Sequence, residues 1–134
     1  MLCKILISNQ FFLILLDPPT VQVQQSSYSV TTGNTVTLVC TVTSNLPITN
    51  VYWQRNIGGS ITNIATTNTN TNKYSGGTTT TPSLTIFSVQ QSDVGTYSCY
   101  GSNSVGTDQS STTLSVTGST YFDSIWIMLS NLTF

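Results

Sequence analysis

The chain has 134 residues, enough for one domain with short flanking segments. It carries three basic and four acidic residues and no histidine, for a formal net charge of −1. So few basic residues cannot follow a phosphate backbone or hold the chain on an anionic membrane surface, so we expect no nucleic-acid partner. Serine and threonine supply 44 residues, and the polar surface must come mainly from hydroxyl and amide groups.

The N-terminal segment, residues 1–17, begins MLCKILISNQFFLILL, with one lysine ahead of two apolar runs that Ser8-Asn9-Gln10 separate. A charged start followed by an apolar stretch is typical of a secretory signal peptide, and the stretch is too short to span a bilayer as a helix. We therefore predict a signal peptide over residues 1–17. A wrongly assigned first exon is the alternative, because no small-x-small cleavage site precedes Asp17.

The middle of the chain shows short strand signals separated by turn residues, with no helical period. The pattern predicts strands over residues 20–25, 30–40 (two strands with a turn at Gly33-Asn34), 48–56, 60–65, 73–77, 83–89, 95–102 and 110–116. Alternation along these strands directs Trp53 and Val51 inward and leaves Tyr52 and Gln54 on the outer face. The Thr- and Asn-rich run up to residue 72 is expected to be a loop.

Two cysteines and a tryptophan are the most informative residues of this region. Trp53 follows Cys40 by thirteen positions, and Tyr97 stands two positions before Cys99. This spacing indicates two packed β-sheets with an indole at their centre. The third cysteine, Cys3, lies in the predicted signal peptide.

A family resemblance rests on three strings of the sequence. Residues 84–99, LTIFSVQQSDVGTYSC, resemble the corner motif of V-set and I-set domains of the immunoglobulin superfamily. Residues 99–106, CYGSNSVG, are similar to the I-set ending, in which Asn and Gly shape a hairpin. Residues 73–76, KYSG, resemble the Arg-Phe-Ser-Gly of V-set domains. The resemblance covers about residues 18–117 and leaves I-set and short V-set open.

The resemblance implies an all-β, immunoglobulin-like Greek-key β-sandwich over residues 18–117, with one inter-sheet disulfide between Cys40 and Cys99. Such a bond would contribute about 4 kcal/mol on the chain-entropy model. It would also place the protein in an oxidising compartment, either secreted or on the extracellular face of the cell surface. Two free thiols in an intracellular module are the alternative.

The same resemblance implies a set of structural residues. These are Trp53, Lys73, Leu84, Ile86, Asp93, Gly95 and Tyr97. In V-set domains the basic residue of the Arg-Phe-Ser-Gly string pairs with the acid that matches Asp93, so we predict an ion pair between Lys73 and Asp93. Because lysine lacks the two-pronged geometry of arginine, this pair should be weaker than its counterpart.

Catalytic and metal-binding motifs are absent from the sequence. Without histidine the chain cannot form Ser-His-Asp or Cys-His arrangements, and it also has no glutamate. No CxxC, HExxH, Walker A or EF-hand pattern occurs, so we expect no metal site and no cofactor. We expect that the protein is not an enzyme; a Ser–Lys dyad that uses Lys73 is a formal alternative.

Candidate binding residues lie on one sheet face and in one loop. Tyr52 and Tyr100 should face outward from neighbouring strands with Gln54 beside them, and aromatic residues are enriched at interface centres. Ordinary cross-strand packing is the alternative. The loop over residues 103–109 adds Asn103 and Asp108, the latter expected to be a solvated turn residue.

The C-terminal tail, residues 118–134, departs from the family pattern. Its apolar run over residues 125–129 is too short to span a bilayer, so a truncated anchor, a sticky tail and translated intron all stay open. Asn131 begins the only N-glycosylation sequon, a weak candidate close to the chain end.

These observations predict an extracellular immunoglobulin-like recognition module that binds a protein ligand or a homophilic partner, in adhesion or immune-type recognition. The alternative is a structural spacer repeat from a longer multi-domain extracellular or muscle-type protein. Membrane attachment is left open.

Overall fold

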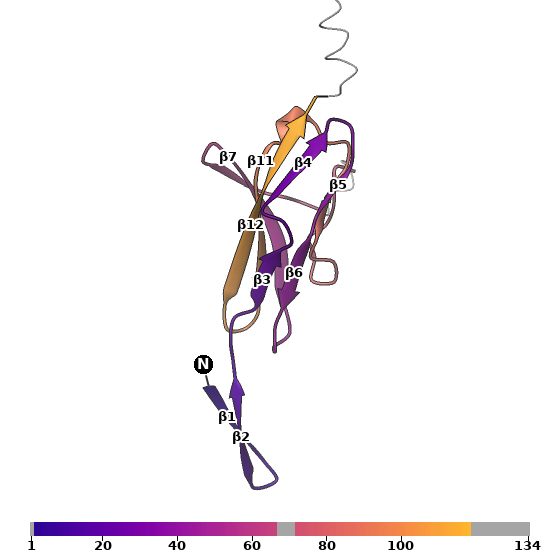
Figure 1. Ribbon diagram of the computed structural model, residues 1–134. Coiled ribbons are helices and arrows are strands. Elements are labelled where there is room, and N and C mark those ends of the chain that lie inside the picture. Colours follow the sequence, from indigo (N-terminus) through magenta and orange to yellow (C-terminus); the bar gives the residue numbers. More distant parts are fainter. Residues whose placement is uncertain (1, 67–71, 119–134) are drawn as a thin grey trace, which may run out of the picture.

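Five strands form the larger of two layers. The structure is a computed structural model that describes residues 2–66 and 72–118. In spatial order the strands are β4 (Ser27–Thr31), β12 (Thr107–Thr117), β11 (Gly95–Ser102), β7 (Asn50–Ile57) and β8 (Ser60–Asn63). Neighbouring strands run antiparallel except β4 and β12, which are parallel (Figure 1).

Two short sheets make up the second layer. In one, β3 (Thr20–Val23) pairs with β6 (Cys40–Thr43); in the other, β10 (Leu84–Ile86) lies between β5 (Val36–Leu38) and β9 (Tyr74–Gly76). Only Val39 separates β5 from β6, and its backbone N–H and carbonyl groups both form hydrogen bonds. Its N–H donates to Tyr28 Oη at 3.1 Å, and its carbonyl accepts from Gln24 N at 3.0 Å.

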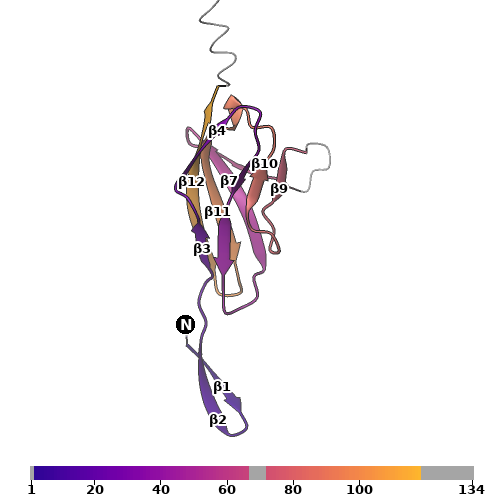
Figure 2. The same cartoon turned by 45° about the vertical axis from the view of Figure 1, so that its right-hand side comes forward.

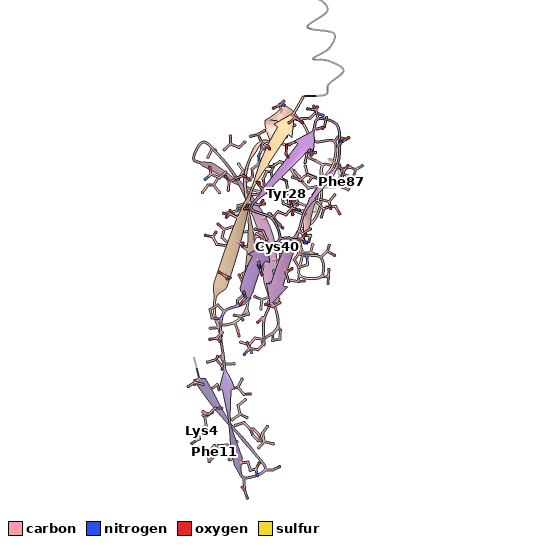
Figure 3. All side chains as sticks on the ribbon, in the orientation of Figure 1. Lys4, Phe11, Tyr28, Cys40 and Phe87 are labelled. Carbon is pink, nitrogen blue, oxygen red and sulfur yellow. A yellow bond between two sulfur atoms is a disulfide. The ribbon has the colours of Figure 1, made fainter. Side chains whose placement is uncertain are left out.

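Apolar side chains that alternate along these strands form the core between the layers. The buried apolar residues are Val21, Val36, Leu38, Cys40, Val51, Trp53, Leu84, Ile86, Val89, Tyr97, Cys99 and Leu114. Cys40 on β6 and Cys99 on β11 form the disulfide that joins the layers, and Figure 3 labels Cys40 within the body of the sandwich. The predicted all-β immunoglobulin-like sandwich with one inter-sheet disulfide is confirmed.

The beginning of the sandwich differs in detail from the predicted strands. The expected strand over residues 20–25 ends at Val23, and the chain then crosses to the other layer as β4. β4 begins at Ser27 rather than at Val30, because its parallel pairing with β12 supplies the hydrogen bonds. Ser27 and Ser29 alternate with Tyr28 and Val30, which pack against the core, so the sequence did carry a signal for this part of the strand that the prediction left out.

The last strand is longer than predicted. β12 begins at Thr107, not at residue 110, so Asp108 and Gln109 belong to a strand and not to a loop. The turn before it is short because Asn103 Oδ1 accepts hydrogen bonds from the backbone N–H groups of Val105 (2.9 Å) and Gly106 (3.1 Å). The loop candidate over residues 103–109 is thereby reduced to a tight turn.

The N-terminal segment forms a hairpin that extends from one end of the sandwich, as both views show (Figures 1 and 2). β1 (Leu2–Ile7) pairs with β2 (Gln10–Leu15), and Ser8 and Asn9 adopt positive φ at the turn. Most of its large apolar side chains are exposed, and Lys4 Nζ lies 3.9 Å from the centre of the Phe11 ring (Figure 3). The signal peptide over residues 1–17 stays a prediction.

The predicted tail falls almost entirely outside the described residues. Residues 119–134 are among those not described, and with them the Asn131 sequon. Across residues 2–66 and 72–118, no helix is long and apolar enough to cross a membrane.

The disulfide gives a first test of the fold. The two cysteines are 59 positions apart, and removal of the bond by Cys40→Ala/Cys99→Ala should lower the free energy of unfolding by about 4 kcal/mol. Urea unfolding followed by tryptophan fluorescence measures this difference. Cys3→Ala is the matched control, because Cys3 is a free cysteine in the hairpin. Equal urea midpoints for the double variant and the control would contradict the prediction.

Candidate functional site

Two tyrosines occupy the outer face of the five-stranded sheet. Tyr52 on β7 lies directly opposite Tyr100 on β11, and the rings stack with centroids 4.8 Å apart and planes 1° apart. Both point outward because their neighbours Trp53 and Cys99, which also lie opposite each other, are buried. The juxtaposition predicted from alternation is present, and each tyrosine is half-buried.

Hydroxyl and amide groups around the tyrosines hydrogen-bond to one another. Gln54 Nε2 donates to Asn63 Oδ1 at 2.9 Å, which ties β7 to the edge strand β8. Across β11 and β12, the Oγ atoms of Ser98 and Ser111 lie 2.8 Å apart, and Ser102 Oγ lies 2.7 Å from Thr107 Oγ1. We call this surface, made by the outward side chains of β7, β8, β11 and β12, the tyrosine face.

The tyrosine face carries no charged side chain. The two charged residues of its strands, Arg55 and Asp108, belong to the opposite, inward register of β7 and β12. Arg55 Nη2 donates to the carbonyl oxygens of Ser92 and, at 3.1 Å, Val94. Recognition by this face would therefore depend on aromatic surface and neutral polar groups, without charge steering.

Two candidate binding residues have structural roles instead. Asn103 is only 7% exposed, and its Nδ2 donates to the Asp17 carbonyl at 2.7 Å and to Ser44 Oγ at 2.9 Å. Asp108 was expected to be a solvated turn residue, which is wrong: it lies in β12, and its Oδ2 accepts a hydrogen bond from Val21 N at 2.8 Å. Asn103 is thus buried, and one carboxylate oxygen of half-buried Asp108 is engaged by the backbone of β3.

The predicted corner residues gather where the short 3-10 helix η1 (Gln91–Asp93) leads into β11. Lys73 Nζ lies 2.5 Å from Asp93 Oδ2, which also accepts a hydrogen bond from Gln90 N at 2.7 Å. Tyr97 Oη donates to the Asp93 carbonyl at 2.7 Å. The buried carboxylate is thus held by a charge and a backbone donor, which offsets its loss of water.

Other predicted structural residues pack against this corner or within the core. Leu84 and Ile86 are fully buried, and a Cβ added at Gly95 would lie 2.9 Å from the Asn56 carbonyl oxygen. Sequence reasoning missed Arg55, whose guanidinium lies 5.8 Å from the centre of the Tyr97 ring. Its position two residues after the core tryptophan was the one available signal, because alternation places it on the inner side of β7.

Burial changes the acid–base behaviour of this corner. Burial raises the pKa of the Tyr97 hydroxyl above its usual value. Of the nearby charges, Arg55 lowers this pKa and Asp93 raises it, and both effects are smaller than that of burial. Burial also raises the pKa of Tyr74. Among residues 2–66 and 72–118, no group of three or more potential metal ligands comes together.

We expect stability to fall at alkaline pH. Above pH 10.0, the usual pKa of tyrosine, the unfolded chain loses a proton that buried Tyr97 retains in the folded state. Unfolding should then become easier by about 1.4 kcal/mol for each pH unit. Urea unfolding at several pH values from neutral into the alkaline range measures the slope. Tyr97→Phe should be less stable at neutral pH by about 1 kcal/mol and show a flatter alkaline slope. An unchanged slope in that variant would refute the assignment.

Asn103→Ala should destabilise the fold. The change leaves the N–H groups of Val105 and Gly106 without their side-chain acceptor, at a cost of about 2 kcal/mol. The urea midpoint measures the loss, with Ser104→Ala, an exposed neighbour in the same turn, as the matched control. Equal changes in the urea midpoint for the two substitutions would show that the buried Asn103 side chain contributes nothing to stability.

The chain is similar in sequence to a known protein and in fold to solved structures. The chain is 38% identical over 93 residues to the basement membrane-specific heparan sulfate proteoglycan core protein of Mus musculus, a match that covers 69% of this chain and 2% of that protein. An I-band fragment of titin superposes with a TM-score of 0.60 at 27% identity, covering 78% of this chain and 34% of the fragment. The tandem Ig repeats of Dlar give a TM-score of 0.59 at 24% identity, covering 77% and 51%.

The titin and Dlar structures share the fold of this chain, and the chain spans only a small part of the matched proteoglycan. The sequence model of the immunoglobulin I-set domain matches residues 19–116. This match decides between the I-set and V-set alternatives that the sequence left open. The chain belongs to the immunoglobulin I-set domain family.

Proposed function

We propose that the chain is an extracellular recognition module that binds a protein partner through the tyrosine face and performs no catalysis. The observation that carries the proposal is the stacked pair of Tyr52 and Tyr100, 4.8 Å apart on a face without charged side chains. Aromatic residues supply large contact area with few rotatable bonds, so they lose little conformational entropy on binding.

Rigidity supports this proposal. Hydrogen bonds between neighbouring strands hold the polar side chains around the tyrosines, such as Gln54 on Asn63 and Ser98 on Ser111. The disulfide and the core fix the sheet beneath them. A surface that is already ordered before binding avoids part of the entropy cost of association.

Neutrality favours a second copy of the chain as partner. When two identical faces meet about a twofold axis, a charged residue near the axis lies close to its own like-charged copy. The tyrosine face has no such residue, so its self-association would meet no repulsion between like charges. A homophilic contact is therefore the partner we test first.

An extracellular location rests on the disulfide, which persists in oxidising compartments. The matched mouse protein is named as a basement membrane proteoglycan, which is an extracellular setting for that protein. Adhesion is the role in which a homophilic face outside the cell would act.

A structural spacer is the second candidate. The matched Dlar structure consists of tandem Ig repeats, the titin fragment spans I67–I69, and the chain corresponds to 2% of the mouse proteoglycan. In a spacer the stacked tyrosines would only stabilise the sheet by cross-strand packing.

Alanine substitution separates the two candidates. For the full chain, we expect sedimentation velocity to show concentration-dependent self-association that Tyr52→Ala/Tyr100→Ala weakens by about tenfold or more. Thr37→Ala/Thr85→Ala is the matched control, because it removes an exposed cross-strand pair from the other layer, with Oγ1 atoms 2.9 Å apart. A monomeric wild type whose tyrosine variant only melts at lower temperature would support the spacer and refute the homophilic face.

A further inference from the structure

The loop between β9 and β10 presents four consecutive threonines to solvent. Thr78, Thr79, Thr80 and Thr81 are all exposed, and Pro82 follows them directly. A hydrogen bond from Gly77 N to the Ser83 carbonyl, 2.9 Å long, closes the base of the loop. Figure 2 shows the labelled strands β9 and β10 that carry it at one side of the sandwich.

The four hydroxyls are not equivalent. Thr78 Oγ1 accepts a hydrogen bond from Thr81 N at 3.0 Å and lies 3.2 Å from Thr80 Oγ1. The hydroxyls of Thr79 and Thr81 have no hydrogen-bond partner within residues 2–66 and 72–118. Serine and threonine hydroxyls on the tyrosine face, by contrast, bond across strands, as in Ser102 with Thr107. Thr79 and Thr81 are therefore the accessible nucleophiles of the loop.

Pro82 anchors the end of the loop that carries these hydroxyls. Pro82 has no N–H to donate to a strand, so it favours a loop over strand pairing. Its carbonyl accepts a hydrogen bond from Trp53 Nε1 at 2.8 Å, which anchors the end of the loop to the core. Threonine-rich segments with a proline are the sequence type that receives O-linked glycans.

We propose that Thr79 and Thr81 are acceptor sites for O-linked N-acetylgalactosamine. The threonine Oγ1 would attack the anomeric carbon of the sugar in uridine diphosphate N-acetylgalactosamine and form a C–O bond. The bond from that carbon to the diphosphate breaks, uridine diphosphate leaves, and the hydroxyl proton passes to a base of the transferase. Modification in the cell rests on the proposed extracellular location, because such transfer occurs during secretion.

The position of the loop gives the modification a consequence for recognition. Thr78 and Thr79 line an open hollow of about 360 Å³ together with Tyr52. A glycan on Thr79 would stand at the edge of the tyrosine face and add hydration to a surface with little charge. The presence or absence of a glycan on the loop would then determine how closely a partner can approach the tyrosine face from this side.

Transfer with purified components tests the site directly. The full chain, produced with its disulfide in a host without O-glycosylation, is incubated with uridine diphosphate N-acetylgalactosamine and a polypeptide N-acetylgalactosaminyltransferase. Intact mass gives the number of sugars added, and electron-transfer fragmentation assigns them to residues. We expect sugar on Thr79 or Thr81 of the folded chain.

Three double variants test whether the sugar is attached to Thr79 and Thr81. Thr79→Ala/Thr81→Ala should lose the sugar from this loop, whereas Thr79→Ser/Thr81→Ser should keep it. The matched control Thr107→Ala/Thr113→Ala, exposed threonines of β12, should be labelled in the loop as the wild type is. A folded wild type without sugar in the loop, or one labelled there only after reduction and unfolding, would overturn the proposal. Because the reaction uses purified components, this outcome is independent of whether cells secrete the chain.

Discussion

The contact between the two layers at Trp53 and the disulfide is the constraint from which the candidate site follows. Trp53 lies opposite Cys99 in the pairing of β7 with β11, and its ring nitrogen donates to Pro82 in the other layer. Because these two residues must face inward, Tyr52 and Tyr100 must face outward and opposite each other. A shift of register by one residue would expose the disulfide and bury the tyrosines. The tyrosine face is thus fixed by the core beneath it.

The few charges of the sandwich are used to hold its structure. Lys73 pairs with Asp93, Arg55 donates to one carbonyl oxygen within η1 and one directly after it, and Asp108 accepts a hydrogen bond from the backbone of β3. Their concentration at inner and corner positions leaves the outer face of the large sheet neutral. Recognition there would come from aromatic contact and from the threonine loop beside Tyr52, and salt concentration should affect it little.

Residues whose roles depend on alternation were predictable from the sequence, whereas residues whose roles depend on distant backbone groups were not. Alternation placed Trp53 and Tyr52 on opposite faces, and the family resemblance paired Lys73 with Asp93. The sequence could not show that Asn103 binds the Asp17 carbonyl or that Asp108 binds Val21, 86 and 87 positions away. Asp108 resembled a solvated turn residue because its partner is a backbone N–H, which has no side-chain signal. For Asn103 the family resemblance indicated a role in shaping the hairpin, but not its contacts with Asp17 and Ser44.

By itself, the sequence determined the all-β class and the outward direction of the tyrosines, because these follow from period-two alternation. The sandwich and the disulfide were predicted through the resemblance of its motifs to immunoglobulin domains. Only the tertiary structure decided where the chain crosses between layers at β3 and β4, and how far β12 extends. It also decided which polar groups are already bonded and which, like the hydroxyls of Thr79 and Thr81, are open to solvent. These outcomes depend on hydrogen bonds between segments far apart in the chain, and local sequence carries no record of them.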